Sequence, residues 1–162
     1  MQPYLDYFTL PGNERYYDFV WGPVHFFMLD TDEREPDGTS ATSIQGRGLE
    51  RKLAGSKARW KLVFAHPAPF SSGRVPGFQH MRWPFKPWGA DAVLSGYYHV
   101  YERLWVDDLT YFVNGLGGAS ISGFGETDIN SQFRYYETNG AMLVDAGHAQ
   151  ITFRFINRGG RI

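Results

Sequence analysis

Cysteine is absent from all 162 residues of this sequence. Its absence excludes disulfide bonds, zinc sites built from thiolates and cysteine nucleophiles together. A chain without cysteine tolerates any redox environment, so the absence does not indicate a compartment.

An excess of charge of one sign is also lacking, because 16 Lys and Arg residues offset 17 Asp and Glu residues to a net charge of −1. This balance gives no electrostatic case for binding nucleic acid or an anionic membrane. No apolar run approaches the ~20 residues of a membrane span. The segment Met1–Asp6 lacks the basic stretch and apolar core of a signal peptide. We expect neither a nucleic-acid nor a membrane partner, and the location of the protein stays open.

Apolar residues are plentiful, since 43% of the chain is hydrophobic and 17% is aromatic. A chain of this length can bury roughly 70% of the surface that it exposes when unfolded. No internal repeat and no linker interrupts the sequence. We expect one globular domain over residues 1–162.

Short apolar runs between turn residues predict most of the secondary structure. Strands are expected over residues 16–20, 24–30, 60–65, 91–94, 109–114, 140–145 and 150–156. Helical spacing predicts a helix over Leu49–Ala54 that ends at Gly55, after a polar loop over Thr31–Gly46. A broken helix is expected over Gln79–Trp88 because of its prolines, and Gly115–Gly125 should be a loop. Strands alternate with helices at first and then follow one another, which predicts an α/β sandwich with mixed sheets.

Two histidines stand where strands of the predicted sheet end. His66 follows the apolar run 60–65, and His99 comes shortly after the run 91–94. The carboxyl ends of strands are where α/β folds place their sites, and imidazole is a common ligand of Zn, Fe and Mn. His25, inside an apolar strand, is expected to be a core histidine instead.

The segment Gly96-Tyr97-Tyr98-His99-Val100-Tyr101-Glu102-Arg103 resembles the "GHxH…YER" segment of calcineurin-like metallophosphoesterases, in particular of the purple-acid-phosphatase-like branch. The run Trp60–Gly73 is similar to that family's strand into "HxPxYSSG", whose leading histidine corresponds to His66. Further segments resemble the family in matching order; they are Tyr16–Phe19, Val24–Phe27, Leu49–Trp60 and Tyr111–Ala119. The resemblance covers nearly the whole chain.

This resemblance implies a metallophosphoesterase-like β-sandwich with flanking helices, of which the chain matches the C-terminal half. It implies that His66 and His99 bind a divalent or ferric metal ion (Zn, Fe or Mn) and that the substrate is a phosphate ester. The family's N-terminal motifs, which carry a bridging carboxylate and a catalytic histidine, have no match here. Gly12-Asn13-Glu14 looks like one of them but has Glu14 in place of the histidine, and we expect a turn there. Two imidazoles without a bridging carboxylate cannot hold two metals ~3.5–4 Å apart.

Tyr97 stands at the position of a metal-binding histidine of the family, and it has two interpretations. Its phenolate could bind ferric iron, or its ring could fill the space that a lost metal leaves. His80 is a candidate for a catalytic or substrate-contacting residue near the site. Glu102 and Arg103 are expected to form a structural ion pair behind it.

Asp30 and Asp32 follow a strand, where they could offer carboxylates, but capping or loop roles are expected. Other motif classes fail. Gly115-x-Gly117-Gly118 does not open a helix, so it is no dinucleotide fingerprint, and the segment 118–123 misses a nucleophile elbow by one residue. Ser71 or Ser72 could pair with His66 only if their loop folds back.

Three hypotheses follow for function. The first is a metal-dependent phosphoesterase with an incomplete dinuclear site, active with one metal or only weakly active. The second is a non-catalytic remnant or interaction module of the same fold, and the third is a hydrolase with a Ser–His pair. A homodimer is expected because the missing half of the fold would leave an apolar sheet face and a strand edge exposed.

Overall fold

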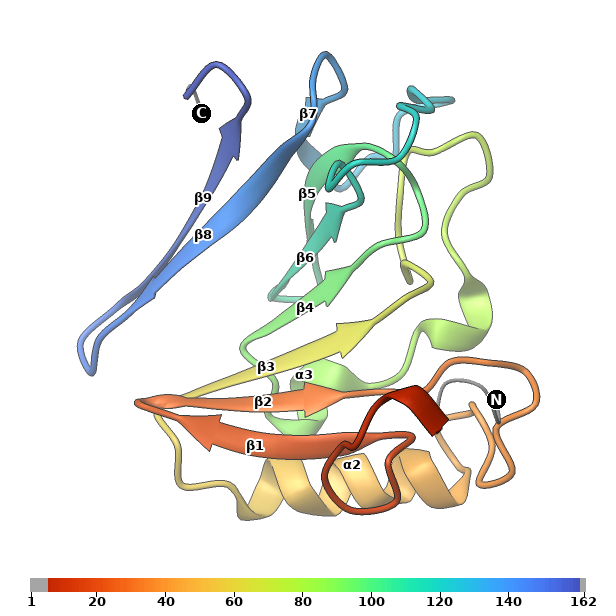
Figure 1. The fold of residues 1–162 in the computed structure, drawn as a ribbon, viewed down its shortest axis with the longest axis vertical. Coiled ribbons are helices and arrows are strands. Elements are labelled where there is room, and N and C mark those ends of the chain that lie inside the picture. Colours follow the sequence, from red (N-terminus) through yellow and green to blue (C-terminus); the bar gives the residue numbers. More distant parts are fainter. Residues whose placement is uncertain (1–5, 161–162) are drawn as a thin grey trace.

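A large mixed sheet forms the centre of the computed structural model, which describes residues 6–160 (Figure 1). Its seven strands have the order β1-β2-β3-β4-β6-β5-β7, and β8 and β9 form a second, two-stranded sheet. The neighbours β2, β3, β4 and β6 are parallel, whereas β1, β5 and β7 pair antiparallel. This arrangement confirms the α/β fold class with mixed sheets.

The edge of the sheet that comes first in the chain is a hairpin of β1 (Tyr17–Trp21) and β2 (Val24–Met28). Its turn contains Gly22 at a φ of 54°, a conformation that glycine adopts without a steric cost. The two strands lie within one or two residues of the ranges expected from the sequence.

The first helix of the core, α2 (Ile44–Gly55), is longer than the sequence suggested. Ser43 caps it, because its Oγ accepts a hydrogen bond from the Gly46 N–H at 3.1 Å. The loop expected over Thr31–Gly46 therefore ends at Ser43, and the helix begins five residues before Leu49. The first turn of the helix was not predicted because Gly46 and Gly48 have low helix propensity.

The middle of the chain follows the expected order. The elements are β3 (Trp60–Ala65), the 3₁₀ turn η1 (Gln79–Met81), α3 (Phe85–Trp88) and β4 (Ala92–Ser95). The helix expected over residues 79–88 is thus two short pieces separated at Pro84, as its prolines predicted.

Two strands were missed. The strand β5 (Tyr101–Val106) precedes the expected β6 (Leu109–Asn114), and β7 (Ser131–Tyr135) pairs with β5 at the far edge of the sheet. The register shift in the β5–β7 pair marks a β-bulge. The hairpin expected near the C-terminus is present as β8 (Gly140–Ala146) and β9 (Ile151–Asn157).

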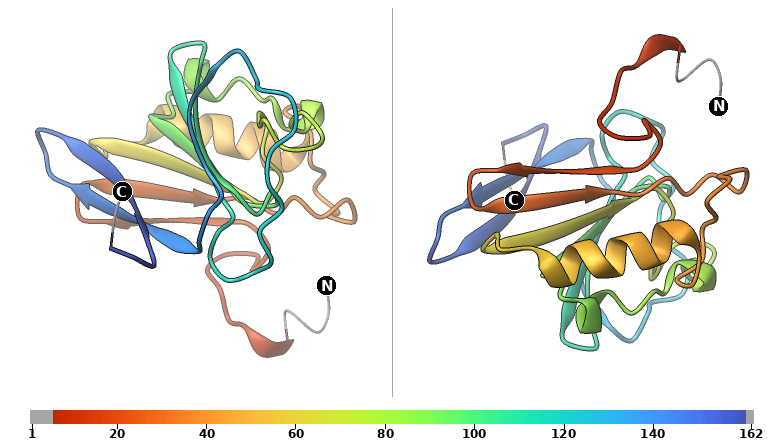
Figure 2. Two further views of the ribbon diagram at one scale, coloured as in Figure 1. Left: turned by 90° about the horizontal axis from the view of Figure 1, so that it is seen from above. Right: turned by 90° about the horizontal axis from the view of Figure 1, so that it is seen from below.

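The large sheet separates two apolar cores. On one face, Phe27, Val63 and Val93 pack with Leu49 and Leu53 of α2, which lies along the sheet in Figure 2. On the other face, the β8–β9 hairpin packs across the sheet, with Phe153 against Phe112 and Phe155 against Tyr101.

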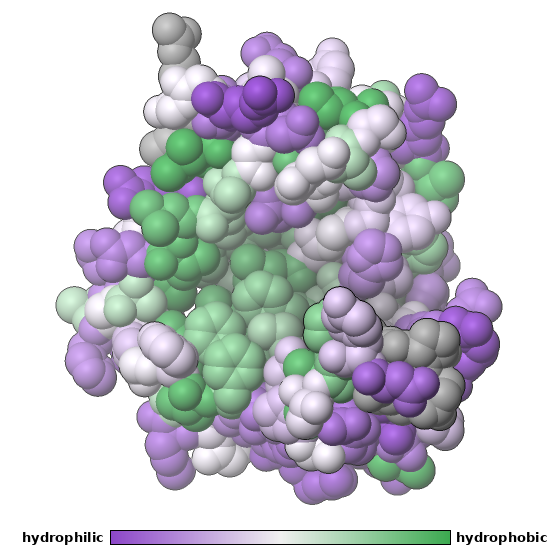
Figure 3. All heavy atoms as spheres, in the orientation of Figure 1, coloured by the Kyte–Doolittle hydropathy of each residue, from purple (hydrophilic) through white to green (hydrophobic). Residues whose placement is uncertain are grey.

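The hairpin covers this second face only in part. The ring of Phe19 on β1 stacks on Phe26 of β2, with 4.9 Å between centroids, and the ring of Phe64 on β3 lies 6.0 Å from Phe26 on the other side. Figure 3 shows apolar residues gathered in a hollow of this face. We call the row Phe19, Phe26 and Phe64 the aromatic face.

Within residues 6–160, no helix is long and apolar enough to cross a membrane. The expectation of no signal peptide rests mainly on residues 1–5, which lie outside the described part of the chain.

Candidate functional site

The parallel strands β3 and β4 bring the first candidate ligand and the Gly96–His99 motif to one edge of the sheet. Ala65 pairs with Ser95, so His66 and Gly96 follow their strands side by side. The Gly96 N–H donates to the His66 carbonyl oxygen at 3.1 Å. A Cβ on residue 96 would lie 3.4 Å from His66 Nδ1, so the glycine leaves room for the imidazole. The backbone at His66 and Gly96 is therefore fixed by strand pairing and by this hydrogen bond.

Tyr97 lies over this frame in an unusual conformation. Its φ of 68° is in the left-handed region, which a residue with a bulky side chain adopts at a cost. The ring is 49% exposed and packs edge-on against Phe78, with 4.7 Å between centroids, and against His66 at 5.7 Å. The surrounding aromatic contacts hold the tyrosine beside His66, where the family's motif has a histidine.

His66 and Tyr97 open into a cavity of about 700 Å³. The residues that line it are Arg15, Leu29, Asp30, Thr31, Asp32, Glu33, Arg34, His66, Pro67, Phe78, His80 and Tyr97. His80, the candidate for a catalytic role, therefore shares the cavity with His66. Phe78 and Arg15 were not foreseen, because neither belongs to a motif or to a strand end.

His99 does not line this cavity and lies against the loop that follows β6. Its Nδ1 is 2.7 Å from the carbonyl oxygen of Ser120, and its own carbonyl accepts from the Ser122 N–H at 3.2 Å. A carbonyl oxygen can only accept, so Nδ1 carries the proton and Nε2 keeps a free lone pair. A hydrogen bond from one ring nitrogen to a backbone carbonyl is typical of a metal-binding histidine.

The two aspartates at the end of β2 have loop roles. Asp30 Oδ1 accepts from the Asp32 N–H, and Asp32 accepts from both the backbone and the guanidinium of Arg34. Burial raises the pKa of Asp30, whereas the hydrogen bonds of Arg34 hold the pKa of Asp32 well below its usual range. Both residues line the cavity, and both carboxylates already accept hydrogen bonds from neighbouring residues of the loop.

Glu102 is fully buried behind the motif and organises the loop after His66. Its carboxylate accepts from Ser71 Oγ at 3.1 Å, from the Ser72 N–H at 2.7 Å, and from the hydroxyls of Ser72 and Ser131. The expected ion pair with Arg103 does not form, because neighbouring residues of a strand point to opposite faces and Arg103 is exposed. Glu102 is therefore bound to hydroxyl groups rather than to a guanidinium.

This network also bears on the proposed Ser–His pair. The hydroxyls of Ser71 and Ser72 both donate to Glu102 and are buried, so neither is directed to His66. His25 is satisfied as a core histidine, with Nε2 2.9 Å from Asp18 and Nδ1 2.9 Å from Ser56 Oγ.

The segment that resembled an N-terminal motif is a turn, as expected. Gly12 has a φ of 68°, and the Glu14 N–H donates to the Pro11 carbonyl. Asn13 Oδ1 accepts from the N–H groups of Arg15 and Tyr16, so its amide oxygen is used within the turn.

The donor set does not fit a dinuclear metal centre. Among residues 6–160, no group of three or more His, Asp or Glu side chains is placed to hold a metal ion. His66 lines the cavity, whereas His99 lies against the loop after β6; each carries an imidazole, which is a common metal ligand.

Comparison with known proteins places the fold. No family model matches the sequence, and no curated protein matches it. Among solved structures, the purple acid phosphatase PPD1 from yellow lupin (Lupinus luteus) seeds matches with a TM-score of 0.77 over 96% of this chain. The chain has a purple-acid-phosphatase-like metallophosphoesterase fold.

The sequence identity to PPD1 is 19%, and the chain spans 33% of the length of PPD1. GAP50, the anchor in the inner membrane complex of Plasmodium, matches with a TM-score of 0.69 and 18% identity, over 90% of this chain and 50% of GAP50. The chain thus spans between a third and a half of these structures, and it corresponds to the C-terminal part of the fold, as its motifs predicted.

Proposed function

We propose that this chain is a metal-dependent phosphate-ester hydrolase of reduced metal content, in which His66 and His99 bind one divalent or ferric ion. The observation that carries the proposal is the pairing of Ala65 with Ser95, which sets His66 beside Gly96, the first residue of the motif that contains His99. A bound ion would act as a Lewis acid and lower the pKa of its water. The substrate class is a phosphate ester.

Two histidines have specific roles in this proposal. The hydrogen bond from His99 Nδ1 to Ser120 fixes the tautomer that leaves Nε2 free to bind. His80 lines the cavity with His66 and is placed to contact a bound ester. Because the family's other metal ligands are not on this chain, catalysis should be slow.

Hydrolysis of p-nitrophenyl phosphate with Zn²⁺, Mn²⁺ or Fe³⁺ tests the proposal. We expect turnover far below the ~10 s⁻¹ of an ordinary enzyme, and loss of that activity in His66→Ala and in His99→Ala. His148→Ala is the matched control, since His148 lies in the turn between β8 and β9. Activity that survives in both site variants, or turnover near 10 s⁻¹, would contradict the proposal.

A second candidate function is a non-catalytic module of the same fold. Tyr97 favours it, because its ring packs against His66 at the position of a family metal ligand. GAP50, which has a similar fold, is described as an anchor rather than by a reaction. Tyr97→Phe separates the roles of this residue: unchanged metal binding indicates a filler, and lost binding indicates a phenolate ligand.

We also propose that the protein forms a homodimer through the aromatic face and β1. Among the strands of residues 6–160, β1 pairs with β2 alone, and its residues Val20 and Trp21 are strongly exposed. Two copies of one edge can pair antiparallel about a two-fold axis, so this edge is complementary to itself. Edge pairing alone extends the sheet, so the second copy must also pack over the aromatic face to cover Phe19 and Phe26. Its carboxylates could then reach the histidines.

A further inference from the structure

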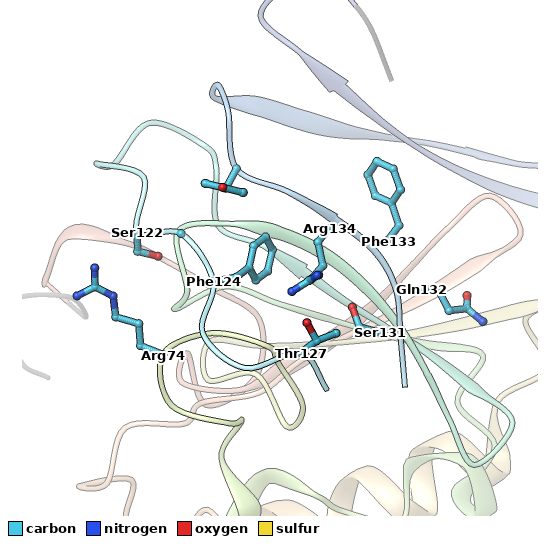
Figure 4. Close-up of a pocket in the computed structure, with 10 residues that line it drawn as sticks. Arg74, Ser122, Phe124, Thr127, Ser131, Gln132, Phe133 and Arg134 are labelled. Atoms are coloured by element: carbon cyan, nitrogen blue, oxygen red, sulfur yellow. The ribbon is translucent and has the colours of Figure 1, made fainter. Parts of the chain in front are cut away.

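A second cavity, of about 740 Å³, lies between the loop after β6 and the edge strand β7 (Figure 4). We call it the arginine groove and define it by Arg74, Ser122, Phe124, Thr127, Arg134 and Tyr136. None of His66, His80, Tyr97 and His99 lines this groove, although the N–H of its residue Ser122 donates to the His99 carbonyl oxygen.

The charge of the groove is positive and uncompensated. The side chains of Arg74 and Arg134 form no ion pair or hydrogen bond with any residue from 6 to 160, and none of the residues lining the groove is acidic. In contrast, Arg15 and Arg34 at the other cavity are each paired with carboxylates. Two free guanidinium groups on one cavity are complementary to carboxylates or to other anions.

The groove also has an aromatic wall. The guanidinium of Arg134 lies 5.2 Å from the ring centroid of Phe124, and Phe124 meets Tyr136 edge-on at 5.6 Å. The neighbouring Ile121 and Phe133 are exposed. Arginine together with exposed aromatic side chains is the composition that is enriched at protein interfaces.

The arrangement of the side chains suits an extended ligand. Arg74 reaches the groove from the loop after β3 and Arg134 from β7, and in Figure 4 the Phe124 ring lies between them. A ligand that satisfies both arginines needs anionic groups separated by an apolar part. The net charge of −1 and the absence of further basic lining residues favour a peptide over a nucleic acid.

We propose that the arginine groove binds an extended acidic peptide segment of another protein, with an aromatic residue between its carboxylates. The carboxylates pair with Arg74 and Arg134. The aromatic residue packs on Phe124 and Tyr136, and the hydroxyls of Ser122 and Thr127 offer hydrogen bonds to the peptide backbone.

The test uses the full chain and a fluorescein-labelled random copolymer of glutamate and tyrosine, followed by fluorescence anisotropy. We expect saturable binding that is stronger than binding of polyglutamate and that weakens with salt. The double variant Arg74→Gln/Arg134→Gln should weaken it at least ~10-fold. Arg51→Gln is the matched control, because Arg51 is an exposed arginine of α2. Circular dichroism of each variant verifies that the fold is kept.

Three results would overturn the proposal. They are no binding of the copolymer, an equal loss of binding in Arg51→Gln, and displacement of the copolymer by oligothymidylate. Tyr136→Ala provides an independent measurement, since it leaves both charges in place. It should reduce the preference for the tyrosine-containing copolymer over polyglutamate, and an unchanged preference would contradict the role of the aromatic wall.

Discussion

Glu102 shows most clearly how a single residue supports the candidate site. Its carboxylate is fully buried, and four donors from three serines surround it. It thereby ties the loop after His66 to β5 and β7. Sequence reasoning identified Glu102 as structural but chose the wrong partner, because hydroxyl groups far apart in the chain leave no local signal.

Replacing Glu102 by glutamine should be strongly destabilising. An amide offers one acceptor oxygen in place of two and directs its NH₂ group at hydroxyls that already donate. We expect the free energy of unfolding to fall by about 1.5–3 kcal/mol, the typical range for a hydrogen bond to a charged group. Urea denaturation measures this change. Glu50→Gln, at an exposed position of α2, should stay within ~0.5 kcal/mol; an equally small effect at Glu102 would contradict the account.

At the scale of elements, Asp18 joins three parts of the fold. Its carboxylate on β1 contacts Lys52 of α2 and accepts from His25 of β2. Burial acts to raise the pKa of Asp18, but the hydrogen bonds from Lys52 and His25 outweigh it and hold the pKa below the usual value. The folded state therefore favours the ionised form of Asp18.

This pKa shift predicts a pH dependence of stability. A carboxyl group whose pKa is lowered on folding contributes stability above its unfolded pKa of about 3.9, and that stability is lost as the pH falls through the folded value. Asp18→Asn should cost roughly 0.5–1.5 kcal/mol at pH 7. Urea denaturation from pH 7 to pH 2.5 should show the difference from the natural protein shrinking below about pH 4. A difference that is constant across this range would rule out the ion contacts as its cause.

Some of the strands could be predicted from the sequence and others could not. Strands β3 and β6 were predicted to the residue, because each is a nearly continuous apolar run between turns. The strand β5 was missed, since Glu102 is charged yet buried and so breaks the alternation. The strand β7 was missed because it is an exposed edge strand with little apolar pattern. The arginine groove, built from loops and β7, was missed with it.

For the whole molecule, the two faces of the sheet differ in their cover. The helices α2 and α3 close one face, whereas the β8–β9 hairpin leaves the aromatic face partly open. The apolar runs of β2 and β3 were expected to be covered on both sides. A second copy of the chain would complete that cover.

Size-exclusion chromatography with light scattering tests the proposed homodimer. We expect twice the 18.5 kDa mass of the chain at micromolar concentration. Phe19→Glu should shift the protein to a monomer, because it puts a charge into the aromatic face. Ile129→Glu, at a residue that is 95% exposed outside that face, should leave the dimer intact. A monomer of the natural chain would contradict the proposal.

We propose that this fold presents His66 and His99 as ligands of one metal ion. Titration of the metal-free full chain with Zn²⁺ by isothermal calorimetry tests it most directly. We expect one ion bound per chain, with binding lost in His66→Ala and in His99→Ala and kept in His148→Ala. Absence of binding by the natural chain, or the same stoichiometry in His66→Ala, would contradict it.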